Sequence, residues 1–228
     1  MNESWPPPAA ATGLSVEPLA FPDGEGVLFR RAFAPGESTR LFATLHQETD
    51  WRQQVIVLYG RSISSPRLSA WHGDSDAVYR YSGLRLEPAP WTPILLDVRE
   101  RVEALAAARF NSVLLNLYRD GQDSMGWHSD DEPELGRNPL IASISLGAAR
   151  RFLLQHKKRR LRLEWLLEDG DVLVLGGTTQ HCWRHHVPKI RQPMGPRINL
   201  TFRWIHGPRD LSSCSDEPPS AILEPSRQ

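Results

Sequence analysis

Two stretches in the first half of the chain have the hydrophobic spacing of amphipathic helices. Residues 37–49 bring their apolar side chains to one side of a helical projection. In the second stretch Thr92 is suited to cap a helix, and Pro93 occupies the favoured first helical position. Apolar residues then recur at helical spacing through residues 93–105. We therefore predict a helix in each stretch.

After Arg109 the pattern changes to short segments of alternating or β-rich character, separated by glycines. We predict strands at residues 112–117, 141–146, 151–155, 161–165, 171–175 and 197–204. Many short strands after two helices predict an α+β chain with a mostly β core. The expected architecture is an antiparallel sandwich or barrel with the helices packed on one side.

The chain has 228 residues, enough for one domain with a substantial core. Residues 1–17 contain three consecutive prolines and a short alanine run, so we expect a disordered leader. Serine, proline and acidic residues dominate residues 211–228, which we expect to form a loose tail. Residues 18–210 are then a single domain, which we expect to be a monomer.

Charge and composition narrow the class of protein. Lys+Arg and Asp+Glu both number 27, which argues against a uniformly basic coat protein for nucleic acid. No apolar run is long enough to span a membrane, and we find no signal peptide. The two cysteines form no disulfide framework. These features predict a reducing compartment: the cytoplasm, or the nucleus if the source is eukaryotic.

The main chemical signal is the triplet His128-Ser129-Asp130. On an extended strand, residues two apart point to the same face, so His128 and Asp130 can reach one metal ion. A third ligand is available from His181, His185 or His186. Two histidines and one carboxylate on one face leave open metal positions, as in non-haem Fe(II) oxygenases. A zinc site with the same ligands is chemically possible too.

The segment from Arg197 to Arg203 alternates polar and apolar residues. In a strand, its polar residues share one face (Arg197, Asn199, Thr201 and Arg203). Arginines on an inward face need anionic partners, because an unpaired buried charge is very costly. A dicarboxylic co-substrate would satisfy both arginines. The alternative is a surface strand whose arginines face water.

These motifs, in this order and spacing, resemble the AlkB family of Fe(II)- and 2-oxoglutarate-dependent dioxygenases. The resemblance covers about residues 50–205 and is nearest to the subgroup that works on duplex DNA. It rests on Asn116-Leu117-Tyr118, the 128–130 triplet, His185 with Pro188 three residues on, and the 197–203 segment. It implies a double-stranded β-helix, or jelly roll, and the use of Fe(II), 2-oxoglutarate and O2.

Carried over residue by residue, the resemblance assigns a metal set and a co-substrate set. His128, Asp130 and His185 would bind iron; His185 is preferred because it stands at the family distance before Arg197. Arg197 would pair with the distal carboxylate of 2-oxoglutarate. The other co-substrate contacts would be Asn116, Tyr118, Arg203, Thr201 and Asn199.

The resemblance also implies a substrate, because relatives demethylate 1-methyladenine and 3-methylcytosine. Tyr79 and Tyr81 would clamp a flipped base, although ordinary sheet aromatics have the same spacing. Asp131 and Glu132 would favour a cationic base, although a solvated acidic loop gives the same pattern. Tyr59 aligns with a wedge that enters the DNA stack, and Arg67 would contact DNA nearby.

The segment from Arg150 to Arg162 contains seven cations and no acid, and we predict a hairpin with a basic tip that contacts phosphates. The predicted function is oxidative demethylation of alkylated DNA, with formation of succinate and release of formaldehyde. Three alternatives remain at this point. They are the same chemistry on methylated RNA or on a protein, a non-catalytic nucleic-acid-binding jelly roll, and a zinc hydrolase.

Overall fold

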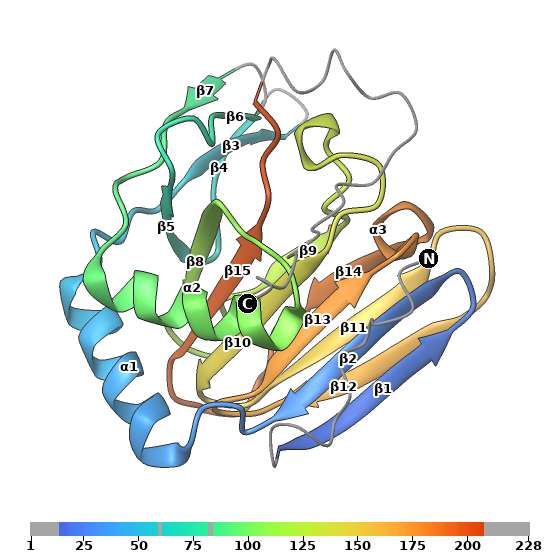
Figure 1. Ribbon diagram of the computed structural model, residues 1–228, viewed down its shortest axis with the longest axis horizontal. Coiled ribbons are helices and arrows are strands. Elements are labelled where there is room, and N and C mark those ends of the chain that lie inside the picture. Colours follow the sequence, from blue (N-terminus) through green and yellow to red (C-terminus); the bar gives the residue numbers. More distant parts are fainter. Residues whose placement is uncertain (1–13, 59–60, 82–83, 208–228) are drawn as a thin grey trace, which may run out of the picture.

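The protein contains two antiparallel sheets that pack face to face (Figure 1). The computed structural model describes residues 14–58, 61–81 and 84–207. The larger sheet has seven strands in the order β1 (Ser15–Phe21), β2 (Gly24–Arg30), β13 (Val172–Gly176), β10 (Ile141–Gly147), β15 (Arg197–Arg203), β8 (Ser112–Tyr118) and β5 (Leu68–Gly73). The smaller sheet has the order β12 (Arg162–Leu167), β11 (Arg150–His156), β14 (Trp183–Val187) and β9 (Met125–His128).

The remaining elements are short, apart from two helices of equal length. Helices α1 (Pro35–Glu48) and α2 (Pro93–Ala106) lie on the same side of the larger sheet (Figure 1). Two separate hairpins follow α1 in the chain, β3 (Val55–Leu58) with β4 (Arg61–Ser64) and β6 (Tyr79–Tyr81) with β7 (Leu84–Leu86). A 3-10 turn, Pro133–Leu135, follows β9, and the one-turn α3 (Thr179–Cys182) precedes β14.

Strand alternation divides the core into two layers. In β13, Val172 and Val174 belong to the cluster that includes buried residues of α2. Leu173 and Leu175, on the opposite face, pack with residues of the smaller sheet such as Phe152. Strand β13 is therefore apolar on both faces, as expected for a central strand covered on each side. The space between the two sheets is where the functional pocket forms.

The predicted elements after Arg109 correspond to observed strands, and the two predicted helices correspond to α1 and α2. Thr92 caps α2, with its side chain accepting a hydrogen bond from the amide of Leu95. The strand predictions did not include β1 and β2, which form one edge of the larger sheet, β5, which forms its other edge, or β14, which carries His185. The predicted domain start at residue 18 falls inside β1, because that strand pairs with β2 along its whole length from Ser15.

Gly147 occupies the turn between β10 and β11, which carries the chain from one sheet to the other. Its φ angle is +84°, a conformation that side-chain-bearing residues rarely adopt. A Cβ atom there would lie 2.6 Å from the carbonyl oxygen of Pro196. Glycine is therefore required for the crossing that leads into β11, whose Phe152 lines the pocket.

Candidate active site

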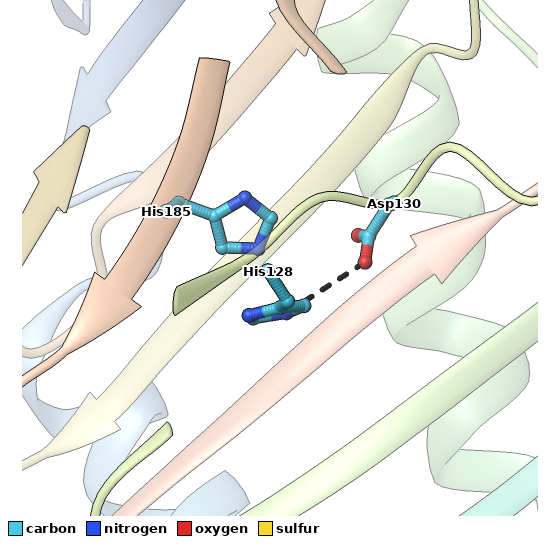
Figure 2. Close-up of side chains that lie close together, drawn as sticks. All are labelled: His128, Asp130 and His185. Carbon is cyan, nitrogen blue, oxygen red and sulfur yellow. Dashed lines mark ion pairs between the residues drawn. The ribbon is translucent and has the colours of Figure 1, made fainter. Parts of the chain in front are cut away.

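Three predicted metal ligands converge between the two sheets. His128 lies at the end of β9, His185 lies opposite it on β14, and Asp130 lies two residues beyond the end of β9. One ligand atom from each side chain lies within 4.8 Å of the other two, and Figure 2 shows the three groups pointing toward one another. Asp130 is therefore in a loop rather than on the predicted strand, yet it still reaches the cluster.

The hydrogen bonds of the histidines indicate which nitrogen faces the centre. His128 Nδ1 lies 2.9 Å from the carbonyl oxygen of Gly126, which can only accept, so Nδ1 carries the proton. This leaves Nε2, 3.8 Å from Asp130 Oδ1, with its lone pair free for a metal. His186, a candidate from sequence, instead stacks on Trp127 with 4.8 Å between ring centroids. Its Nδ1 lies 2.5 Å from the carbonyl oxygen of Met125.

The electrostatics of the cluster favour an anionic carboxylate and a neutral imidazole. Burial opposes ionisation of Asp130, but Arg203 and the two histidines outweigh it and lower the pKa of Asp130 to about 2. Arg203 Nη2 donates to Asp130 Oδ2 at 2.9 Å. Burial and the neighbouring His128 lower the pKa of His185 to about 3. Both groups are thus in the protonation state that a metal requires at neutral pH.

Gln180 supports Asp130 and was not predicted. Its side-chain Oε1 accepts a hydrogen bond from the backbone N–H of Asp130 at 3.0 Å, which fixes the orientation of the amide. Gln180 is buried, lines the pocket and leaves its Nε2 without a partner. No pattern marked it, because a single glutamine in a helix of one turn has no periodicity.

The predicted co-substrate residues line the same pocket as the metal cluster (Asn116, Tyr118, Arg197, Asn199, Thr201 and Arg203). Arg197 is only 2% exposed, and burial lowers its pKa to about 10. Its Nη2 donates to Ser145 Oγ at 2.9 Å, whereas Nε and Nη1 have no partner. Two open donors on a buried guanidinium fit a carboxylate, which accepts such pairs in bidentate geometry.

The other members of this set differ in how free their polar atoms are. Asn116 Oδ1 accepts from Arg67 Nε at 2.8 Å and from Ser69 at 3.3 Å, which leaves its Nδ2 to donate. Asn199 Nδ2 donates to Ser143 and to a backbone carbonyl, while its Oδ1 accepts from Thr201. Asn199 therefore braces Thr201 and the pocket wall. Alternation in β10 places Ser143 and Ser145 on one face, a signal that the sequence reading overlooked.

The predicted substrate contacts have mixed outcomes. Arg67 lies beside the pocket through its bond to Asn116. Tyr59 and the side chains of Tyr79 and Tyr81 lie outside the described residues. Asp131 and Glu132 do not line the pocket. Asp131 is exposed and pairs with Lys157 Nζ at 2.8 Å, while Glu132 directly precedes the 3-10 turn.

The predicted basic hairpin is formed by β11 and β12, but its charges are less free than the sequence suggested. Arg150, its first cation, is buried, and Arg151 pairs with Glu164 on the neighbouring strand. Arg159 pairs with Asp23 at 3.0 Å. Carboxylates distant in sequence therefore neutralise part of the run. Lys158 and Arg160, in the tip, are exposed and form no ion pair within the described part of the chain.

Comparison with known proteins agrees with this geometry. The model of the 2OG-Fe(II) oxygenase superfamily matches residues 26–203. The chain is 40% identical over 182 residues to alpha-ketoglutarate-dependent dioxygenase alkB homolog 3 of Bos taurus, covering 75% of this chain and 62% of the relative. It is 37% identical over 184 residues to DNA oxidative demethylase ALKBH2 of Homo sapiens, covering 76% and 70%. The chain belongs to the AlkB family. The resemblance to the AlkB family that the sequence motifs indicated is thereby confirmed.

The fold of this AlkB-family chain also matches solved structures. "The structure of OsALKBH1" superposes with a TM-score of 0.58 at 19% identity, covering 81% of this chain and 99% of the other. A 2OG-Fe(II) oxygenase family oxidoreductase from Burkholderia pseudomallei gives a TM-score of 0.52 at 16% identity, covering 80% and 86%. These likenesses confirm the jelly-roll core. The chain spans about three fifths of the length of the alkB homolog 3 relatives.

Family membership identifies Fe(II), 2-oxoglutarate and O2 as the cofactor and co-substrates, and the pocket fits them. Two imidazoles and one carboxylate suit Fe(II), and the free donors of Arg197 suit a dicarboxylate. The paired inward arginines have no evident role in a zinc hydrolase. In the described ranges, no helix is long and apolar enough to cross a membrane.

Proposed function

We propose that the protein is an oxidative demethylase that repairs 1-methyladenine and 3-methylcytosine in DNA. The observation that carries the proposal is the coexistence of the His128, Asp130 and His185 cluster with the open donors of Arg197 in one pocket. The ALKBH2 relatives are named DNA oxidative demethylases, which supports DNA as the substrate.

In this proposal each residue of the pocket has a separate task. His128, Asp130 and His185 hold Fe(II), and Arg203 keeps Asp130 ionised. Arg197 binds the distal carboxylate of 2-oxoglutarate, while Asn116 and Tyr118 donate hydrogen bonds to the same molecule. When bound, iron would couple the reduction of O2 to the oxidative decarboxylation of 2-oxoglutarate to succinate and carbon dioxide, and the second oxygen atom of O2 would hydroxylate the N-methyl carbon, whose product then loses formaldehyde.

The chain's own contribution is orientation and exclusion of water. The apolar part of the pocket wall is formed by Met125, Ile141, Phe152, Leu173, Leu175 and Val187. An apolar wall lowers the local dielectric, which strengthens the pairing of Arg197 with a carboxylate. It also keeps bulk water from the reacting carbon.

Recognition of DNA is assigned to elements outside the pocket. Lys158 and Arg160 at the β11–β12 tip contact backbone phosphates, which gives affinity without sequence preference. Tyr79 and Tyr81 clamp the flipped base, with Asp131 and Glu132 near its exocyclic groups. Tyr59 acts as the wedge in the stack, and Arg67 contacts DNA nearby.

The test uses the full chain with Fe(II), 2-oxoglutarate and ascorbate on oligonucleotides that contain one 1-methyladenine. Substrates are single-stranded DNA, duplex DNA and RNA of the same sequence, and the products measured are formaldehyde, succinate and repaired base. His185→Ala should abolish repair, whereas His186→Ala, its neighbour on β14, should retain it. Greater activity on RNA than on either DNA would replace the DNA assignment, and no repair of any substrate would reject demethylation of these bases.

A further inference from the structure

The ring of Tyr118 contacts two buried guanidinium groups. The central carbons of Arg150 and Arg197 each lie 5.3 Å from the ring centroid. Arg150 is 1% exposed and Arg197 is 2% exposed. The positive charge of Arg150 is one of the influences that lower the pKa of Arg197, so the two cations lie within each other's field.

Arg150 does not line the pocket, and its hydrogen bonds go to backbone carbonyls. Its Nη1 donates to Asp120 O at 3.2 Å, and its Nη2 donates to Asp123 O at 2.8 Å and to Pro188 O at 2.6 Å. Asp120 and Asp123 belong to the loop that enters β9, and Pro188 directly follows β14. Arg150 therefore ties together the ends of both strands that carry the metal-binding histidines.

The charge of Arg150 is only partly compensated where it lies, because burial lowers its pKa more than the fields of Tyr118, Asp123 and Asp120 raise it. Arg150 forms no ion pair in the described part of the chain, its Nε lacks a partner, and burial lowers its pKa. The carboxylate of the adjacent Asp123 is held by Arg119 at 2.8 Å instead. Two neighbouring buried cations without a shared carboxylate are costly to the fold.

A bound anion would offset this cost. The free Nε and Nη1 of Arg197 already point to a carboxylate as that anion. A carboxylate at Arg197 would lie in the combined field of both guanidinium groups, because both contact the same tyrosine ring. A ligand that lacks this carboxylate would leave the cost of the two neighbouring charges in place.

We propose that Arg150 is a positioning residue that makes the pocket selective for 2-oxo dicarboxylates over 2-oxo monocarboxylates. It fixes Tyr118 and the two loops, and it places a second positive charge behind the distal carboxylate site. The inference rests on the assignment of Arg197 to that carboxylate in the proposed function, and it does not depend on the DNA substrate.

The test measures binding of two matched ligands to the manganese-loaded full chain by calorimetry, without nucleic acid. 2-Oxoglutarate and 2-oxovalerate have the same carbon chain, and only the first has a distal carboxylate. Arg150→Met should lower the affinity for 2-oxoglutarate about tenfold, as expected for loss of one charge at low dielectric. The same change should alter the affinity for 2-oxovalerate little. Arg150→Lys, which keeps the charge, should retain most of the selectivity.

The control is Arg151→Met, which removes the next arginine on β11, an exposed residue paired with Glu164. It should leave binding of both ligands unchanged.

An equal loss of affinity for both ligands in Arg150→Met would overturn the proposal, because a purely structural role affects both alike. The proposal also fails if Arg150→Lys loses as much selectivity as Arg150→Met. Arg150→Gln supplies the same comparison if the methionine variant does not fold. If the protein binds 2-oxoglutarate in preference to 2-oxovalerate but repairs no DNA, only the proposed DNA substrate is rejected.

Discussion

Asp130 connects the metal cluster to the rest of the protein through three different partners. Its carboxylate binds Arg203, its backbone amide binds Gln180, and its other oxygen faces His128. Because the carboxylate is buried, Arg203 and His128 reduce the cost of keeping it charged, whereas Gln180 holds the backbone that carries it. Residues that touch a ligand in this way affect metal affinity nearly as strongly as the ligand itself.

Replacement of Gln180 should weaken metal binding although Gln180 is not a ligand in the proposal. Gln180→Met removes the acceptor for the Asp130 amide and should lower Mn(II) affinity by about 10- to 100-fold, the usual effect of losing a supporting hydrogen bond. Titration calorimetry of metal-free protein measures this. Thr178→Ala, an exposed change just before the same turn, is the control. Equal affinities for the Gln180 variant and the natural chain would contradict the supporting role.

The metal-free protein should lose stability as the pH falls below 6.5. The pKa of His185 is about 3 in the folded protein against 6.5 ordinarily, so the unfolded chain takes up this proton first. The resulting slope is at most about 1.4 kcal/mol per pH unit. The pKa of Asp130 is about 2 against 3.8, so its contribution is complete above 3.8 and is lost as the pH falls toward 2.

Urea unfolding of the metal-free chain between pH 4 and pH 7 measures this dependence. His185→Asn removes the titrating group, so its free energy of unfolding should depend less steeply on pH in that range. The remaining histidines contribute equally in both proteins. A variant slope as steep as the natural one would show that His185 titrates normally in the folded protein.

At the scale of elements, the β11–β12 hairpin combines two roles that the sequence could not separate. Its buried face contributes Arg150, Phe152 and Leu154 to the interior, while its tip exposes Lys158 and Arg160. The sequence of residues 150–162 has basic residues at both ends and no acid, so its charges alone do not separate the buried Arg150 from the exposed Arg160. Strand alternation separates them. The tip is available to phosphates, whereas Arg150 is not.

Loss of the two free tip cations should weaken DNA binding without affecting the pocket. The Lys158→Ala/Arg160→Ala variant should bind duplex DNA more weakly, and its slope of log affinity against log salt should become shallower by about 2. Fluorescence anisotropy across a salt series measures both quantities. Arg151→Ala is the comparison, and 2-oxoglutarate affinity should not change in either variant. An unchanged salt slope would remove the tip from the DNA interface.

The fold was predictable where local signals were strong, and less so elsewhere. The Thr92-Pro93 start of α2 and the alternation of β15 are visible in the sequence because they follow local rules. β1 and β2 carry no such signal. β1 pairs only with β2, and β2 joins the sheet by pairing with β13, far along the chain. The metal and co-substrate residues named from the family resemblance line the pocket, whereas Asp131 and Glu132 do not. Gln180 and Arg150 act through contacts that only the folded chain reveals.

For the molecule as a whole, a bound metal should stabilise the native state. The unfolded chain has no preformed cluster, so a metal at about 100 times its dissociation constant adds about 2.7 kcal/mol. Mn(II) should therefore raise the melting temperature in scanning calorimetry, and a chelator should reverse the shift. Asp130→Ala should abolish it, while Asp131→Asn, the adjacent exposed acid, should keep it. A metal-induced shift that survives in Asp130→Ala would place the ion elsewhere.

The pairing of His128 on β9 with His185 on β14 has a consequence for folding kinetics. Strands β10 to β13 lie between β9 and β14 in the sequence. The cluster therefore assembles only after β9 and β14 have paired, which closes a long loop of the chain. Contacts that form after the rate-limiting step affect the unfolding rate and not the folding rate. The ion should therefore leave the refolding rate unchanged and make the assembled chain slower to open.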